Sequence, residues 1–371
     1  MSLFQLRGTL SKQQNILLGI IGLVLFVLVW WALAELFSDQ KPVVDFDPVL
    51  PSQINQDSAE IQVNVDSLIR ADSIKLANAT EFEKVYPLLP PPHRVVGSYP
   101  TLWREDALVS NTFRSIWLNL QGYFWAVIIS IPIGFLIGLL PLFRGLFSKQ
   151  VDALRYLPLT ALTGLFIIWF GIEDQMKIAF LAFGIIVYLL PVVVQRIDEV
   201  QGVYLKTVFT LGAKAWQTIR TVYIPSVMAK LMDDIRVLTA ISWTYIIIAE
   251  LLNRQGGIGS LIYIKARQGQ IEKVFAILII IILIGFLQDR IFVYIDRRLF
   301  PHKYYKTAIP GIKEVEYGVL AILGSVALGL LLIAVVPALA SIINQLMVVT
   351  TVAGLLLVLY GEFRVQSASA E

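Results

Sequence analysis

Few residues of this chain are of a type that could carry out catalytic chemistry. The sequence has no cysteine and two histidines, His93 and His302, which lie in different loops. These counts exclude thiolate metal ligands and disulfides, and they argue against a histidine-based metal site within one chain. The H-E-x-x-H and G-x-S-x-G motifs of zinc proteases and serine hydrolases do not occur. We therefore expect no catalytic residue, metal site or cofactor in this chain, and an intramembrane enzyme is disfavoured.

Acidic residues next to apolar segments are the remaining chemical candidates. Glu250 follows the apolar stretch ISWTYIIIA. A carboxylate inside a membrane is unfavourable and is by default a functional candidate. Near the interface it could instead pair with Arg254, four residues further along a helix. We expect the neighbouring Asp233 and Asp234 to form a solvated helix start, because paired catalytic acids need a shared buried site.

Aromatic, polar and glycine residues accompany Glu250 in the same part of the chain. The group at 243–245 could line a solute pathway, or it could pack against helices and lipid. The segment 256–259, Gly-Gly-Ile-Gly, could be a flexible gate or a tight re-entrant turn. The candidate pathway or gate residues are therefore Trp243, Thr244, Glu250, Gly256, Gly257 and Gly259.

Long apolar segments must position these residues. Of the 371 residues, 57% are apolar and 15% are charged, whereas soluble proteins carry about a quarter charged residues. About 20 helical residues cross the ~30 Å hydrocarbon core of a bilayer. The fold class is thus predicted as an all-α, polytopic helical membrane protein. We expect eight spans, the first a retained anchor and not a signal peptide, at 16–37, 113–140, 153–171, 176–195, 233–252, 273–294, 317–336 and 339–360.

Basic residues in the loops predict the orientation of the spans. Lysine and arginine gather before the first span, between the second and third, between the fourth and fifth, and after the sixth. If every span crosses once, these loops share one side, which the positive-inside rule assigns to the cytoplasm. The N-terminus is then cytoplasmic, and the acidic segment 38–112 is external. The external loop 253–272 is an exception, because it is basic and could meet an anionic surface or ligand.

The longest cytoplasmic loop, 196–232, contains a polar, helix-forming segment. Apolar residues recur at helical spacing between Tyr204 and Ile219, and Gly212 interrupts the pattern where the chain can turn. Pro225 lacks an amide hydrogen, so we expect the helix to break there and redirect into the next span. Such a pair of short amphipathic helices could lie in the lipid interface, pack beneath its own bundle or dock into a partner protein.

The stretch TLGAKAWQTIRTVYIP (210–225) resembles the cytoplasmic EAA loop of binding-protein-dependent ABC importer permeases. Gly212 matches the glycine of that loop, and VYIP (222–225) matches its ending. Where the family begins with Glu-Ala-Ala, this chain has Lys206-Thr207-Val208, which reverses a charge on the docking helix. Flanking segments resemble the nitrate/sulfonate/taurine group, namely LPPPHRVVGSYPTLW (89–103), GLFIIWFGIED (164–174) and IAELLNRQGGIGSLI (248–262). The residues that match or replace the coupling loop are Lys206, Thr207, Val208, Gly212, Ala213, Trp216, Val222, Ile224 and Pro225.

The resemblance implies the permease subunit of an ABC importer that moves a small anionic or zwitterionic solute by ATP-driven alternating access. It implies a homodimer in the bacterial inner membrane, with separate ABC ATPase subunits that bring ATP and Mg, and with an external solute-binding protein. No nucleic-acid partner is expected. Because the chain has no G-x-x-x-x-G-K-[ST] phosphate loop, ATP must be hydrolysed in another chain.

The same reasoning predicts four parts of the chain. These are an N-terminal anchor helix (1–37), an external acidic insert (38–88), a type I importer permease core (89–302), and a C-terminal helical hairpin and tail (303–371). The insert could be a linker or a small fold, and EIQVNV (60–65) suits a short strand. The extra parts and the altered 206–208 motivate an alternative, a non-transporting membrane scaffold or receptor built on a permease core.

Overall fold

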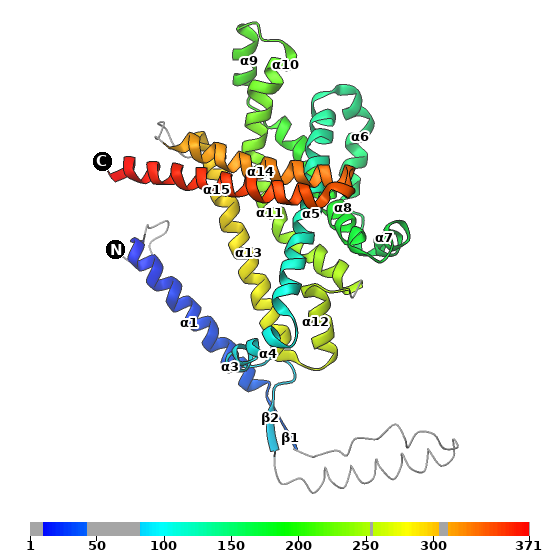
Figure 1. Ribbon diagram of the computed structural model, residues 1–371, viewed down its shortest axis with the longest axis vertical. Coiled ribbons are helices and arrows are strands. Elements are labelled where there is room, and N and C mark those ends of the chain that lie inside the picture. The colour runs from blue at the N-terminus through cyan, green and yellow to red at the C-terminus, as the bar shows by residue number, and fades with distance from the viewer. Residues whose placement is uncertain (1–9, 43–81, 253–254, 304–310, 371) are drawn as a thin grey trace. The chain divides into compact units, whose positions relative to one another are not determined.

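The computed structural model describes residues 10–42, 82–252, 255–303 and 311–370 (Figure 1). By packing, the chain divides into two compact units. The first unit comprises Met1–Glu105 and Lys265–Ala276, and the second comprises Asp106–Ile264 and Ile277–Glu371. The boundaries predicted after residues 37, 88 and 302 rest on changes in sequence composition, and they remain a prediction.

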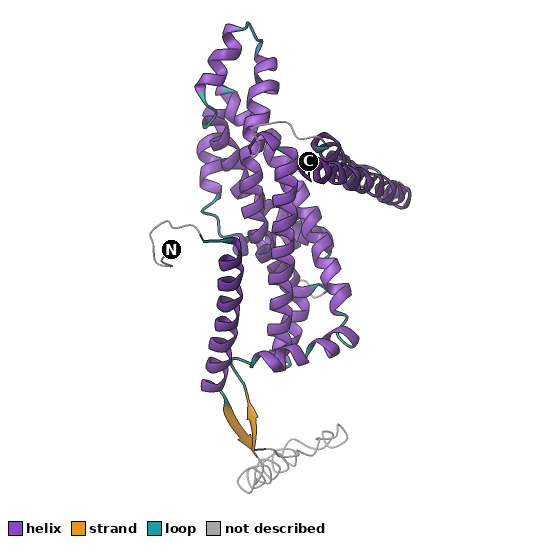
Figure 2. Cartoon of the chain, turned by 90° about the vertical axis from the view of Figure 1, so that its left-hand side faces the viewer, coloured by secondary structure: helices purple, strands orange, loops and turns teal. Residues whose placement is uncertain are grey.

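The first unit is built on helix α1 (Lys12–Leu36), which begins with a capping box. Ser11 Oγ accepts a hydrogen bond from Gln14 N at 3.2 Å, and Gln14 Oε1 accepts one from Ser11 N at 3.1 Å. Strand β1 (Asp39–Pro42) follows and pairs antiparallel with β2 (Phe82–Val85), shown in orange in Figure 2. The two ends of the predicted insert are therefore held together. The predicted strand at 60–65 lies outside the described residues.

Short helices α3 (Pro92–Gly97) and α4 (Tyr99–Arg104) complete the N-terminal part of the first unit. The indole nitrogen of Trp30 donates a hydrogen bond to the carbonyl oxygen of Pro90 at 3.0 Å. Glu35 near the end of α1 forms an ion pair with Lys84 of β2. These contacts tie the anchor helix to the segment that precedes the second unit.

Helices make up the described part of the second unit. In chain order they are α5 (Leu108–Leu139), α6 (Pro141–Leu154), the 3-10 turn η2 (Leu159–Leu162), α7 (Thr163–Phe170), α8 (Asp174–Asp198), α9 (Gly202–Thr210), α10 (Ala215–Thr218), the π-helical turn η3 (Ile219–Tyr223), α11 (Ile224–Leu252), α12 (Ile258–Arg267), α13 (Ile271–Leu299), the 3-10 turn η4 (Pro301–Lys303), α14 (Ile312–Val335), the 3-10 turn η5 (Pro337–Leu339) and α15 (Ala340–Ala370). The end of α12 and the start of α13 belong to the first unit.

Helices α5, α8 and α11 enclose the main core of the second unit. Buried aliphatic residues of α8 such as Leu189 pack with α11 residues such as Leu231 and Ile246. Gly134 and Gly138 of α5 form the small-xxx-small pair that the sequence contains. A Cβ atom at Gly134 would lie 2.5 Å from Val193 Cγ1. These glycines therefore let α5 approach α8 closely.

Membrane-spanning length is reached by seven helices of the described chain, and by up to eight if a bent pair counts as one span. Seven of the predicted spans correspond to these helices, which confirms the all-α polytopic class. The predicted span 153–171 is different, because Pro141–Leu154 and Leu159–Phe170 are bent by 96° at a break. Pro158 precedes η2 at that break. Apolar composition alone did not indicate the bend.

The C-terminal segment is a hairpin of α14 and α15, which lie side by side in Figure 1. Gly318 of α14 faces α15, where an added Cβ would lie 2.9 Å from the carbonyl oxygen of Gly354. Glu314 forms an ion pair with Arg364 near the open end. The structure therefore confirms the predicted C-terminal helical hairpin.

Candidate functional site

The segment predicted as a coupling loop forms two short helices joined by a turn. Helices α9 and α10 are separated by Gly212, which has a φ of +73°. Ala213 N donates a hydrogen bond to Val208 O at 3.0 Å and closes the turn. Glycine suits this position because a left-handed φ strains most other residues. In Figure 1 this turn lies at one end of α11, and the start of α12 lies beyond the other end.

Apolar side chains of this turn point away from the chain's own core. The exposed fractions are 60% for Phe209, 80% for Leu211 and 68% for Trp216. Lys206 and Thr207 are also exposed, whereas Val222 is buried. The segment therefore does not pack beneath its own bundle, which leaves a lipid surface or a partner protein to cover it.

Pro225 does not break the helix as expected. The chain runs from Ala215 to Leu252 as one candidate span, with the π-helical turn η3 directly before α11. The π turn changes the hydrogen-bonding register just before the proline, which lies in the first turn of α11. The missing amide hydrogen is therefore tolerated, and α10 continues into the span.

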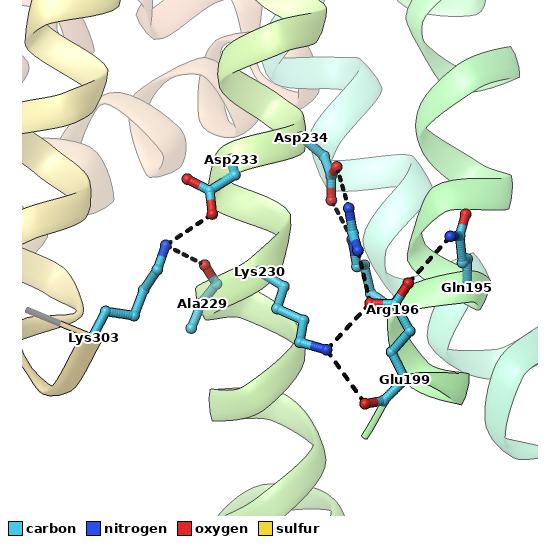
Figure 3. A network of polar contacts seen from close by, with 8 residues as sticks. All are labelled: Gln195, Arg196, Glu199, Ala229, Lys230, Asp233, Asp234 and Lys303. Atoms are coloured by element: carbon cyan, nitrogen blue, oxygen red, sulfur yellow. Dashed lines mark hydrogen bonds and ion pairs between the residues drawn. The ribbon is translucent and has the colours of Figure 1, made fainter. Parts of the chain in front are cut away.

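A set of ion pairs joins α8 to α11 at the end near the turn, and we call it the Arg196 network (Figure 3). The Arg196 guanidinium donates two hydrogen bonds to Asp234, each of 2.7 Å, and one of 2.7 Å to Glu199. Lys230 Nζ donates to Glu199 Oε2 at 3.2 Å, and Gln195 Nε2 donates to Glu199 Oε1 at 3.1 Å. Hydrogen bonds from Arg196, and then from Lys230, lower the pKa of Glu199 below its usual range.

Lys303 forms a second junction at the same end. Its Nζ donates to Asp233 Oδ2 at 3.1 Å and to the carbonyl oxygen of Ala229 at 2.9 Å (Figure 3). It also lies 3.2 Å from both carboxylate oxygens of Asp296, a residue of α13 that is only 4% exposed. Lys303 therefore links the end of α13 to α11.

The prediction that Asp233 and Asp234 begin a helix is wrong, although the Asp233 side chain is solvated as expected, with 58% of it exposed. Helix α11 starts ahead of them at Ile224. The Asp234 side chain is 19% exposed because it pairs with Arg196. Sequence reasoning missed both junctions because the basic partners come from other helices and lie far away in the chain.

At the other end of α11, Glu250 holds the glycine segment, and we call this arrangement the Glu250 clasp. The Glu250 side chain is fully buried. Ser115 Oγ donates to Glu250 Oε1 at 2.6 Å, and Gly259 N donates to Glu250 Oε2 at 2.8 Å. Ser115 Oγ also accepts a hydrogen bond from Ile258 N at 2.8 Å, and Asn111 Oδ1 accepts one from Gly257 N at 2.8 Å. Two side chains of α5 and one of α11 thus fix three consecutive backbone amides.

The glycine segment is a tight turn with little room for side chains. Gly256 and Gly257 have φ values of +97° and +104°. A Cβ atom at Gly257 would overlap the Glu250 carboxylate, and one at Gly259 would lie 2.7 Å from the carbonyl oxygen of Ile247. The observed geometry favours the tight turn over a flexible gate. Arg254, the alternative partner of Glu250, lies outside the described residues.

Charged residues also surround the start of α8 near the clasp. Arg114 Nη2 lies 3.0 Å from both carboxylate oxygens of Asp174. Lys177 Nζ lies 3.4 Å from Asp174 Oδ1, and the Lys177 side chain is fully buried. This end of the bundle therefore encloses an acid, Glu250, and a base, Lys177.

Trp243 and Thr244 do not join the clasp. Trp243 is 6% exposed, and its indole nitrogen donates to Gln288 Oε1 on α13 at 2.8 Å. This contact supports helix packing as the role of Trp243. Thr244 is exposed. Within the described ranges, no group of three or more His, Cys, Asp or Glu residues could hold a metal ion.

Residues 130–301 match the protein family described as binding-protein-dependent transport system inner membrane component. The chain is 31% identical over 198 residues to MJ0413 of Methanocaldococcus jannaschii, which is named as an ABC transporter permease protein. This match covers 52% of this chain and 73% of that protein. The chain is also 26% identical over 218 residues to the taurine transport system permease protein TauC of Escherichia coli, covering 57% of this chain and 79% of TauC.

Among solved structures, a chain of the MetNI methionine ABC transporter in an inward-facing conformation superposes with a TM-score of 0.48. The identity is 19%, and the match covers 54% of this chain and 98% of that chain. The residues that match the family, 130–301, include both α11 and the segment with the Gly212 turn. On these sequence matches, the chain belongs to the binding-protein-dependent transport system inner membrane components, the permeases of ABC importers.

Proposed function

We propose that this permease moves a small anionic or zwitterionic solute by alternating access, driven by ATP hydrolysis in separate ABC ATPase subunits. The relatives TauC and SsuC are named for taurine and aliphatic sulfonate transport, which supports the solute class. In this proposal the permease works as a homodimer in the bacterial inner membrane, and an external solute-binding protein delivers the solute. ATP and Mg bind in the ATPase subunits and not in this chain.

The exposed turn at Gly212 is the observation that carries the proposal. Its exposed apolar residues, Phe209, Leu211 and Trp216, form a knob that suits a groove on a partner protein. Two ATPase subunits that close on ATP would draw two such knobs together. In this proposal the knob and the N-terminus lie in the cytoplasm, and the excess of basic residues in the loops on that side supports this orientation.

A continuous path leads from the turn into the spans. Helix α10 passes through η3 into α11 with no break in the candidate span Ala215–Leu252. The Arg196 network ties α11 to α8, and Lys303 ties it to α13. A push on the turn therefore moves α11 together with its neighbours, while the clasp keeps the glycine turn in place at the opposite end.

Co-purification of an ATPase with the full-length permease tests this function. We expect a nucleotide-hydrolysing subunit to remain bound after mild detergent extraction, and Gly212→Asp to abolish its retention. Gly145→Asp is a matched control, because Gly145 of α6 is exposed and an added Cβ there meets no atom within 4 Å. If the unmodified chain retains no ATPase, or if both variants behave alike, the transport function is wrong and a scaffold or receptor role gains support.

A further inference from the structure

We propose that a small polar cavity beside the break between α6 and α7 is the intramembrane binding site for a small organic anion. The inference rests on the proposed transport function and names the place and charge of the solute within this chain. The cavity has a volume of about 250 Å³. Its lining includes Arg155, Pro158, Thr160, Gly184, Tyr188 and Tyr245, all from the second unit.

The cavity lies at middle depth along the spanning helices. On α8, Tyr188 comes eight residues before Arg196, and on α11, Tyr245 comes five residues before Glu250. At ~1.5 Å of rise per residue, these separations are about 12 Å and about 8 Å. The cavity is therefore between the Arg196 network and the Glu250 clasp. Polar groups inside a membrane-spanning segment, such as these tyrosine hydroxyls, are candidates for a functional role.

The broken helix supplies one wall of the cavity. Leu157 N bonds to Leu154 O at 3.0 Å, and Pro158 then starts a new turn in which Ala161 N bonds to Pro158 O at 2.9 Å. Irregular backbone at membrane depth is tolerated where it is buried in protein or lines a cavity. Transporters place substrates near the bilayer midplane beside such discontinuous helices. The 96° bend, which leaves Arg155 beside the cavity, fits this arrangement.

Gly184 lets the opposite walls of the cavity approach each other. A Cβ atom at Gly184 would lie 2.6 Å from Leu159 Cδ2 and 2.8 Å from Tyr245 Cδ2. The ring of Tyr245 and the broken segment both rest against this glycine. An Ala at position 184 would push the aromatic wall outward and change the shape of the cavity.

The lining favours an anion. Among the described residues that line the cavity, Arg155 is the one that carries a charge, and its side chain is 45% exposed. It donates one hydrogen bond of 3.0 Å to Asp152 Oδ1. A guanidinium has five N–H donors in a planar fork that matches a carboxylate, sulfonate or phosphate group. Tyrosine and threonine hydroxyls can donate to the remaining oxygens, so the site suits a small organic anion or a zwitterion bound through its acidic group.

Thermal unfolding of the full chain in nanodiscs tests the cavity directly. The probes are ethanesulfonate, taurine and choline, each added at millimolar concentration with matched ionic strength. We expect ethanesulfonate and taurine to raise Tm and choline to have no effect. Arg155→Gln should abolish the shift, and Tyr188→Phe should weaken binding about tenfold, as expected for one lost hydrogen bond to a charged group. The control Arg104→Gln removes an exposed arginine of α4 and should keep the full shift.

Three results would overturn the cavity as an anion site. The first is no rise in Tm with either sulfonate probe, and the second is an equal rise with choline. The third is a rise in Tm that is unchanged in both Arg155→Gln and Tyr188→Phe. If Arg155→Gln does not fold, Arg155→Lys and Tyr188→Phe provide the test, since both keep the local charge and volume. An ATPase that co-purifies without any anion shift refutes the cavity alone, whereas an anion shift without an ATPase refutes the transport function alone.

Discussion

The two ends of α11 are fastened by different chemistry. At one end, Arg196, Glu199 and Lys230 are 26%, 33% and 46% exposed and are joined by ion pairs. At the other end, Glu250 is fully buried and is held by a hydroxyl and a backbone amide. Water-accessible ion pairs contribute little each and re-form easily, whereas a buried polar group that loses its partner is strongly unfavourable. The first arrangement suits a joint that moves, and the second suits a turn that must stay in place.

The largest effect should come from Glu250→Ala. It leaves the Ser115 hydroxyl and the Gly259 amide without an acceptor in a buried site, so we expect a loss of about 2–5 kcal/mol in the free energy of unfolding. Unfolding of the purified protein in detergent measures this change. The control is Glu314→Ala, which removes an acid that is 30% exposed and paired with Arg364. If both variants lose the same free energy of unfolding, the buried hydrogen bonds of Glu250 stabilise the fold no more than an exposed ion pair does.

Gly257→Ala should have the next largest effect. The added Cβ overlaps the Glu250 carboxylate, and the backbone has a φ of +104°. We expect a loss of about 2–4 kcal/mol, of which about 1 kcal/mol comes from the backbone. Gly269→Ala isolates that backbone part, because Gly269 has a φ of +70° and no atom within 4 Å of an added Cβ. If the two substitutions lower the free energy of unfolding equally, the contact between the added Cβ and the Glu250 carboxylate does not contribute to the loss.

Arg196→Met should have a moderate effect. It leaves Asp234, at 19% exposure, without its bidentate partner, and we expect a loss of about 1–3 kcal/mol. A double-mutant cycle with Asp234→Asn measures the coupling energy between the two side chains. We expect at least about 0.5 kcal/mol, which is the lower limit for residues in contact. Additive losses would show that the two side chains act independently and that α8 and α11 are not joined by this pair.

Acid should weaken the Arg196 network slightly. The pKa of Glu199 is lowered from its ordinary value of 4.5, first by Arg196 and then by Lys230. The stabilisation is present above the ordinary pKa and is lost as pH falls through the lower pKa of the folded state. Because the side chain is 33% exposed, the loss should be below about 1 kcal/mol and should shrink in high salt. Glu199→Gln should remove this part of the acid sensitivity, and an unchanged acid profile would argue against it.

The smallest effect on folding should come from Lys206→Glu, which restores the acid of the family's coupling loop. Lys206 is exposed on α9, so the free energy of unfolding should change by less than about 0.5 kcal/mol. Retention of the ATPase partner should change, because the charge lies on the proposed docking surface. A variant that is destabilised by several kcal/mol would show that Lys206 supports the fold and not the partner contact.

Several features of the site were readable from particular residues. Gly212 predicted the turn between two short helices, and the loop between the fourth and fifth spans was placed correctly. Pro225 was misread, because the effect of a proline depends on the hydrogen-bonding register of the turn before it. The predicted span 153–171 did not indicate the 96° bend between α6 and the segment after Pro158.

Sequence alone determined the membrane class, the approximate spans and the family, because hydropathy over about 20 residues and short motifs are local properties. The tertiary structure decided which groups meet. Glu250 bonds to Ser115, which is 135 residues away in the sequence, and Asp234 bonds to Arg196, which is 38 residues away. Helical periodicity states which face of a helix is apolar, but it carries no information about which neighbour covers that face. The chemistry of the two ends of α11, and of the cavity between them, therefore exists only once the helices have packed.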